Sequence, residues 1–142
     1  MEVNGIAHIQ LTVTNVNESK KFYEPFLHFL EMMTLIDTSE YFYCIGSRTG
    51  IAISQLDPAL EGDRFAQRRL GLHHFCLRAR QREDIDAIYD IVKGLDVTIV
   101  HPPQDDDYAP GYYSVLFEDR DGIRIEVNHV PGKGHLAKRD AA

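Results

Sequence analysis

Two histidines and one glutamate occupy matched positions in the chain and together could bind a metal ion. His8 and His74 each begin the pattern His–apolar–x–Leu, and each follows a glycine, Gly5 or Gly71, by three residues. Glu126 lies in the middle of a short apolar run near the end of the sequence. Two imidazoles and one carboxylate leave several positions of a divalent ion open to a substrate oxygen, to water or to dioxygen.

Alternation along the predicted strands places all three residues on polar faces. Side chains of a strand point to opposite sides in turn, so His8 shares a face with Gln10 and not with Ile9. In the last strand the same rule places Glu126 with Arg124 and the β-branched residues on the other side. A carboxylate within a strand is costly unless it is paired or binds a metal. The pattern indicates a sheet that curves around a polar cavity.

Other roles for these residues remain open at the level of sequence. His73 or His74 alone is equally compatible with a hydrogen-bonded histidine of the core. Glu126 could form an ion pair with Arg78 or Arg124. The metal hypothesis is favoured because the residues recur at matched positions of two matched halves.

The two halves have the same predicted order of elements, a strand, a helix and three strands. Apolar spacing predicts two helices and a set of short strands, with turns at the Gly and Asp-Gly positions. The first half has strands at about 6–13, 31–37, 41–45 and 51–56, with a helix after Asn17, the predicted N-cap. The second has strands at about 72–79, 97–101, 112–118 and 123–130 and a helix at about 82–93 that stops at Gly94.

Three segments have predictions of their own. Pro25 lies within the first helical pattern and is expected to kink or divide that helix. Residues 57–70 connect the halves, with a helical turn, and residues 102–111 form a rigid acidic loop long enough to lie over a cavity mouth. The tail, residues 131–142, is rich in Gly, Lys and Ala and is predicted to be mobile.

Composition restricts the class of protein. The chain has 142 residues, 44% apolar and 26% charged, which is ordinary for one soluble globular domain. A net charge of −7 argues against nucleic acid or an anionic membrane as partner. Without a long apolar segment or a signal-peptide pattern, a cytoplasmic protein is expected. Cys44 and Cys76 form no CxxC motif and are interpreted as reduced thiols.

The chain resembles the vicinal oxygen chelate superfamily, the glyoxalase/bleomycin-resistance/dioxygenase fold. The resemblance covers about residues 3–130 and rests on His8-Ile-Gln-Leu, on His74-Phe-Cys-Leu and on Pro110-Gly-Tyr-Tyr-Ser-Val-Leu-Phe-Glu-Asp-Arg-Asp-Gly-Ile-Arg-Ile-Glu126. It implies a single α+β domain, residues 1–130, in which two βαβββ modules, residues 3–57 and 71–130, form a cupped, mostly antiparallel mixed sheet around a divalent metal. The family's ligands then fall on His8, His74 and Glu126.

Departures from the family pattern narrow the expected reaction. Glyoxalase I has a fourth ligand, a glutamate, on the last strand of the first half, where counting from the turn glycine gives Ser54. A β-bulge could instead turn Gln55 inward, as in the methylmalonyl-CoA epimerase arrangement. Leu116 stands where fosfomycin-resistance thiol transferases have a tyrosine. Three ligands match extradiol dioxygenases, whose chains are usually longer.

The resemblance therefore implies a metal-dependent enzyme that acts on a small molecule with vicinal oxygens, by isomerase, lyase or dioxygenase chemistry. The cofactor is one divalent ion, Fe, Mn, Ni, Zn or Co, and a homodimer is expected. His101 and Tyr108 are candidates for proton transfer beside Glu126. The residues expected to line the substrate pocket are Gln10, Ser54, Gln55, Tyr112, Tyr113 and Arg124. The alternatives are a non-catalytic protein that binds or sequesters a small molecule, of the bleomycin-resistance type, and an interaction module.

Overall fold

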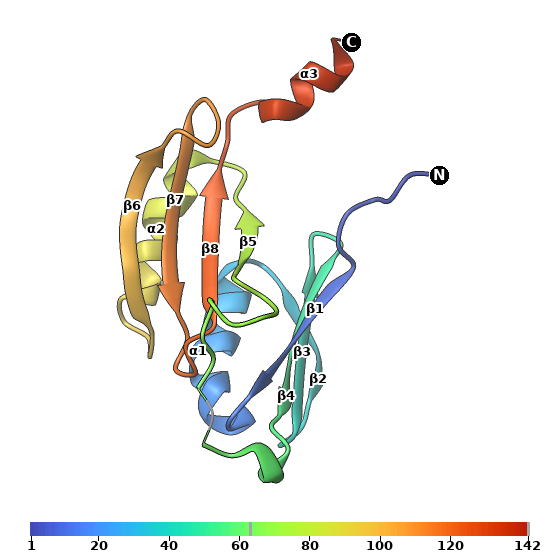
Figure 1. Ribbon diagram of the computed structural model, residues 1–142, viewed down its shortest axis with the longest axis vertical. Coiled ribbons are helices and arrows are strands. Elements are labelled where there is room, and N and C mark those ends of the chain that lie inside the picture. Colours follow the sequence, from blue (N-terminus) through green and yellow to red (C-terminus); the bar gives the residue numbers. More distant parts are fainter. Residues whose placement is uncertain (63, 142) are drawn as a thin grey trace. The chain divides into compact units, whose positions relative to one another are not determined.

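The computed structural model describes residues 1–62 and 64–141, and the chain divides into two compact units, Met1–Arg64 and Phe65–Ala142 (Figure 1). Asp63, within the predicted connection, and Ala142, in the predicted tail, lie outside the described residues. Both units have the order β-α-β-β-β, as the sequence predicts.

The first unit is a four-stranded mixed sheet with one helix. Its elements are β1 (His8–Val13), α1 (Val16–Phe29), β2 (Met33–Asp37), β3 (Tyr41–Gly46), β4 (Thr49–Gln55) and a 3-10 turn at Pro58–Leu60. The strand order is β1-β4-β3-β2, with β1 parallel to β4 and the other pairs antiparallel. Helix α1 packs on β3 and β4 through Phe22, Phe26 and Leu27, all buried.

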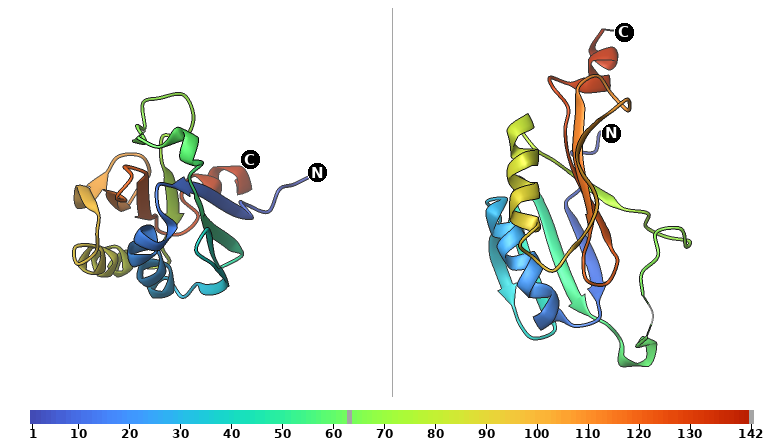
Figure 2. Two further views of the ribbon diagram at one scale, coloured as in Figure 1. Left: turned by 90° about the horizontal axis from the view of Figure 1, so that it is seen from below. Right: turned by 90° about the vertical axis from the view of Figure 1, so that its left-hand side faces the viewer.

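The second unit repeats this topology. Its elements are β5 (Phe75–Arg78), α2 (Arg82–Val92), β6 (Thr98–Asp106), β7 (Tyr112–Glu118), β8 (Arg124–His129), a 3-10 turn at Gly134–Leu136 and α3 (Ala137–Asp140). The strand order is β5-β8-β7-β6, with β5 parallel to β8. Helix α2 lies along one face of this sheet (Figure 2), and its buried Ile85, Ile88 and Val92 face the strands. Because α2 covers one face, the polar side chains of β5 and β8 lie on the opposite face, where they could form a functional site.

The structure corrects two predictions about α1. The N-cap is Asn15 rather than Asn17, because Asn15 has an extended backbone and its side chain accepts a hydrogen bond of 2.9 Å from the amide of Glu18. The helix runs from Val16 to Phe29 without a break, so Pro25 does not divide it, and a kink at Pro25 stays a prediction.

The predicted loop at 102–111 is wrong for the first half of its length. Strand β6 continues to Asp106, and only residues 107–111 form the turn to β7. The pairing with β7 shifts on both sides of His101, and Pro102 and Pro103 fall within the second shift. Bulges let an edge strand include prolines, which lack the N–H for ladder pairing. The sequence analysis predicted a rigid loop here because it did not consider a bulged edge strand.

None of the helices in the described residues is long and apolar enough to span a membrane. The tail contains a 3-10 turn and the short helix α3, and its mobility stays a prediction.

Candidate functional site

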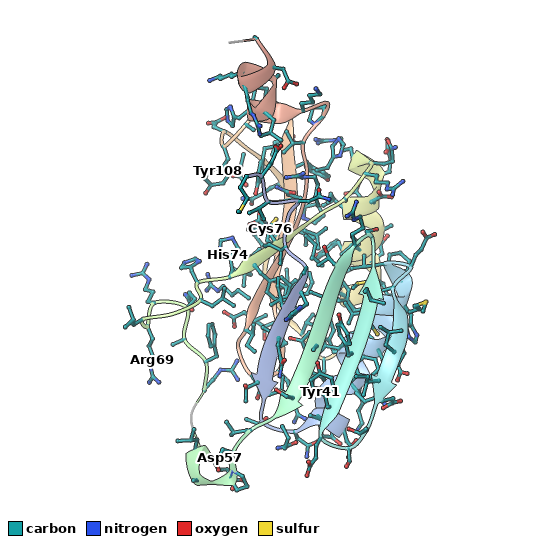
Figure 3. All side chains as sticks on the ribbon, turned by 90° about the vertical axis from the view of Figure 1, so that its right-hand side faces the viewer. Tyr41, Asp57, Arg69, His74, Cys76 and Tyr108 are labelled. Carbon is teal, nitrogen blue, oxygen red and sulfur yellow. The ribbon has the colours of Figure 1, made fainter. Side chains whose placement is uncertain are left out.

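The second unit brings His74 and Glu126 together. His74 directly precedes β5 and Cys76 lies within it (Figure 3). Strands β5 and β8 are parallel, and Cys76 is directly opposite Glu126. Paired residues of neighbouring strands have side chains on the same face. His74 and Glu126 therefore reach the same side of the sheet, as the alternation predicts.

Both oxygens of the Glu126 carboxylate have partners. Nε2 of His74 lies 3.1 Å from Oε2 of Glu126, and the hydroxyl of Tyr112 donates a hydrogen bond to Oε1. The Glu126 side chain is only 12% exposed, so this pairing compensates the cost of burying a carboxylate. Tyr112 thus holds one oxygen of Glu126 while the other faces the imidazole.

His73 is a functional candidate that the sequence analysis considered only as a possible hydrogen-bonded histidine of the core. Its Nδ1 lies 2.7 Å from Nδ1 of His74, and the two rings meet edge to face. A hydrogen bond at one ring nitrogen determines which nitrogen is available for other contacts. Here Nδ1 of His74 is used by His73, and Nε2 is left to face Glu126. The His73-His74 dipeptide was the signal in the sequence.

The alternative ion pairs for Glu126 do not form. Arg124 binds Glu118 instead, with Nε 2.9 Å from Oε1, and both side chains are mostly buried. Arg78 is exposed and pairs with no carboxylate among the described residues. Glu126 therefore keeps its carboxylate for His74 and Tyr112.

The surroundings of Glu126 raise two neighbouring pKa values. The pKa of the Cys76 thiol rises to about 12, first because solvation is lost among neighbouring side chains and second because of the Glu126 charge. The pKa of the Tyr112 phenol is raised well above its usual value by desolvation and by its hydrogen bond to Glu126. Both groups are neutral at physiological pH, so Tyr112 acts as a donor and Cys76 as an uncharged neighbour.

An imidazole nitrogen and a carboxylate oxygen at this separation suit one divalent ion. Two ligands about 2.1 Å from an ion and at about a right angle lie roughly 3 Å apart. The 3.1 Å between His74 and Glu126 matches that value. Among residues 1–62 and 64–141, however, no group of three or more His, Cys, Asp or Glu side chains is arranged to hold a metal. The third predicted ligand, His8, begins β1 in the first unit and is exposed.

The first unit arranges its predicted site residues differently. Gln10 donates a hydrogen bond of 3.3 Å to Ser54, whose hydroxyl in turn donates to the carbonyl of Leu11. The amide of Gln55 donates to the carbonyl of Thr14 and accepts from the amide of Val16. Gln55 thus binds the turn before α1, and β4 has no bulge that would rotate it.

The register of the strands also corrects the prediction of which residue in the first half corresponds to Glu126. In the second sheet Cys76 is opposite Glu126, and in the first sheet Gln10, at the corresponding place after its histidine, is opposite Ala52. Ala52, not Ser54, is therefore the counterpart of Glu126. The count from the turn glycines failed because Ser47 and Arg48 form a tight two-residue turn, while residues 119–123 join β7 to β8.

Three further predicted site residues lie on β7, on β6 and in the turn between them. Tyr113 faces α2, where its hydroxyl donates to Asp86 and the Arg82 guanidinium lies 3.6 Å from its ring centre. His101 is opposite Leu116, which is opposite Glu126, so a row across the sheet connects them. Tyr108 is 73% exposed, and its ring meets that of Tyr112 edge to face. The structure thus groups Tyr108 with Tyr112 and separates Tyr113 from both.

Comparisons with known proteins agree with this architecture. A sequence model of the Glyoxalase/Bleomycin resistance protein/Dioxygenase superfamily matches residues 5–127. The chain belongs to this superfamily. No curated protein sequence gave a significant match to this superfamily member.

Solved structures share the fold of this superfamily member at low identity. They include a candidate glyoxalase from Bacillus halodurans, with 21% identity, a TM-score of 0.76 and coverage of 89% of this chain and 96% of that one. A lactoylglutathione lyase from Agrobacterium tumefaciens has 17% identity, a TM-score of 0.65 and coverage of 91% and 96%. The fosfomycin resistance protein FosX from Mesorhizobium loti has 18% identity, a TM-score of 0.64 and coverage of 97% and 98%. These likenesses establish the fold, and the site must indicate the reaction.

Proposed function

We propose that this protein is a divalent-metal-dependent enzyme that acts on a small molecule with vicinal oxygens, by isomerase, lyase or dioxygenase chemistry. The observation that supports this proposal is the His74–Glu126 pair, 3.1 Å apart on neighbouring strands of one sheet face. We assign His8 as the third ligand because its sequence pattern matches that of His74. When bound, one ion (Fe, Mn, Ni, Zn or Co) would supply a Lewis acid for the substrate oxygens.

The residues around the pair would orient it and keep it available. Tyr112 donates to one oxygen of Glu126, and His73 occupies Nδ1 of His74. Each contact restrains a proposed ligand through an atom that faces away from the site, as supporting hydrogen bonds do in metal proteins. Gln10 and Ser54 remain in the proposed substrate pocket.

Proton transfer is assigned to groups on the same side of the second sheet. His101 can donate from Nδ1 to the carbonyl of Pro102, 2.8 Å away, which leaves Nε2 free to accept a proton. Tyr108 is exposed beside Tyr112 and could contact a bound substrate. If His101→Gln and Tyr108→Phe both leave turnover unchanged, this edge of the sheet is only a cover.

A non-catalytic protein that binds a small molecule, of the bleomycin-resistance type, is the second candidate. It is supported by the family model over residues 5–127, whose description includes bleomycin resistance proteins. In either case we propose a small-molecule ligand and a homodimer, as both accord with the fold.

Metal content separates the two candidates. We would measure bound metal by elemental analysis of protein purified without chelator or metal-affinity resin. The enzyme proposal predicts about one ion per chain, lost in His74→Ala, because that change removes a ligand. A matched control is His28→Ala, since His28 lies on α1 and bonds Thr34 outside the site. The identity of the ion then directs the substrate screen, with iron towards dioxygenation and nickel, zinc or cobalt towards isomerisation. If the wild-type protein contains no metal even after reconstitution, the enzyme proposal is wrong. The non-catalytic small-molecule-binding protein then remains as the function.

A further inference from the structure

Arg78 is a cation on the same sheet face as Glu126. It is opposite Asn128 in the parallel ladder of β5 and β8, one step beyond the Cys76–Glu126 pair. Residues two apart on a strand share a face and lie about 6.6 Å from each other. The Arg78 side chain therefore begins close to the proposed metal site and on its side of the sheet.

Two other arginines of this unit, Arg82 and Arg124, are already engaged. Arg82 makes a two-pronged pair with Asp105, with N–O distances of 2.9 and 3.1 Å. Arg124, on the same face as Arg78, binds Glu118 at 2.9 Å. The Arg78 side chain has no hydrogen bond or ion pair within the part of the chain that the structure describes, although the protein carries a net charge of −7. Its guanidinium is therefore available to an anion from outside.

A buried hydroxyl in the same row also lacks a partner. Ser114 on β7 is opposite Asn128 on β8, which is opposite Arg78 on β5, so the three side chains form one row. Ser114 is 1% exposed, and its Oγ has no hydrogen-bond partner among the described residues. A buried polar group without a partner is unfavourable, and a bound ligand would satisfy it. The Asn128 amide, between the two, donates to the Tyr112 hydroxyl, and an amide has a second N–H that a ligand can use.

We propose that Arg78, with Asn128 and Ser114, binds an anionic group of the substrate, a carboxylate, beside the metal-binding pair. This inference rests on the proposed function and specifies its substrate class. The substrate has vicinal oxygens at one end and a carboxylate a few bonds away, because the Arg78 row is one step along the strands from the Glu126 row. The planar fork of arginine matches a carboxylate with two parallel hydrogen bonds.

Two 2-oxo acids of equal chain length test the proposal directly. 2-Oxoglutarate and 2-oxopentanoate have the same chelating end, and only the first has a second carboxylate. We expect metal-loaded wild-type protein to bind 2-oxoglutarate about tenfold more tightly in calorimetric titrations, because a charge-assisted pair is worth about 1.4 kcal/mol or more. Arg78→Gln should remove this preference and leave 2-oxopentanoate binding unchanged.

Control variants identify the source of the preference. Lys93→Gln makes the same change in net charge on the far side of α2, where Lys93 pairs with Asp90, and should keep the preference. Ser114→Ala should weaken 2-oxoglutarate binding by a few-fold without loss of stability, because its hydroxyl has no partner to lose. Equal affinities for the two acids in wild-type protein that does bind metal would overturn the anion site and leave the metal proposal intact.

A titration without metal makes the test independent of the metal proposal. Glutarate should shift the side-chain Nε–H resonance of Arg78 in a saturable way, and glutaramide, its uncharged diamide, should not. The resonance is identified by its absence in Arg78→Lys. If glutarate leaves that resonance in place, Arg78 is not an anion-binding residue, whatever the metal content.

Discussion

The two sheets have the same topology but differ at one equivalent position. This position pairs with the residue that lies two places after His8 in the first sheet and two places after His74 in the second. In the second sheet this position is Glu126, flanked by Cys76 and Leu116. In the first sheet it is Ala52, flanked by Gln10 and Tyr43. Glu126 contacts His74 and Tyr112, whereas Ala52 is 1% exposed. One half of the repeat therefore keeps a carboxylate at this place, and the other has a small buried residue.

The aromatic ring of Tyr43, which is opposite Ala52, occupies this area of the first sheet. A Cβ added at Gly50 would lie 2.7 Å from Cζ of Tyr43 and still closer to its hydroxyl, so the ring lies directly over Gly50. Glycine is required there because any other residue would meet the ring. The first sheet uses this area for packing, and the second uses it for polar contacts. A duplicated fold can thus keep a buried carboxylate in one copy and a small packing residue at the same place in the other.

The largest predicted effect comes from transferring the carboxylate to the first sheet. Ala52→Glu should lower the free energy of unfolding by about 3 kcal/mol or more, because the new charge is buried without a partner. Urea unfolding of wild type and variant measures the change. Thr12→Glu, at an exposed position of β1, is the control and should change stability by under about 0.5 kcal/mol. If Ala52→Glu leaves stability unchanged, position 52 accommodates a carboxylate as well as position 126 does.

Gly50→Ala tests the packing of Tyr43. The added methyl group should cost about 1–3 kcal/mol, since the ring must move within a packed surface. Tyr43→Leu in the same chain should recover most of the loss in urea unfolding. Gly94→Ala is the control, because its added Cβ would meet its nearest neighbour at 3.5 Å, an ordinary contact. A cost that persists without the Tyr43 ring would point to the backbone instead.

The adjacent residues Tyr112 and Tyr113 point to opposite faces of the second sheet. Tyr112 contacts Glu126 on the polar face, and Tyr113 lies on the face that packs against α2. Tyr112→Phe should weaken metal binding about tenfold or more, because Glu126 loses the donor that holds one of its oxygens. Tyr113→Phe removes a hydroxyl that contacts Asp86 on α2 and should leave metal affinity unchanged. Competition with a chromophoric chelator gives both affinities. Equal losses in the two variants would show that the effect is structural rather than a property of Glu126.

The smallest predicted effect is a pH dependence from Cys76. Its pKa of about 12 in the folded chain is above that of an unfolded thiol, about 8.5. The folded state therefore keeps a proton that the unfolded state loses, and stability falls as pH rises from about 8.5 towards 12. Unfolding of wild type and Cys76→Ala at several alkaline pH values should show a steeper decline for wild type. Parallel declines would mean that the Cys76 thiol is neither desolvated nor close to the Glu126 charge.

Much of this arrangement follows from the sequence because it depends on local patterns. Alternation along the strands correctly placed Glu126 on a polar face and Ile125 on the buried one. The repeated order of elements predicted both modules. The three metal ligands stay a prediction, with only His74 and Glu126 brought together within one unit.

The errors arose where several local solutions have similar energies. Asn15 and Asn17 are both good N-caps, and the end of β1 at Val13 decides between them. Turn lengths differ between the halves, so only pairing across the sheet shows that Ala52 corresponds to Glu126. The partners of Arg124 and Tyr113 depend on tertiary contacts that spacing does not specify.

The prolines of β6 have a consequence for how the molecule meets its neighbours at high concentration. Strand β6 is at the edge of its sheet, and Pro102 and Pro103, which have no backbone N–H, lie within a shift of its register. An incoming strand from another chain would meet an interrupted row of donors and an irregular outline. This edge therefore resists the strand-to-strand stacking that begins amyloid growth, and replacing both prolines should make the protein more prone to fibril formation.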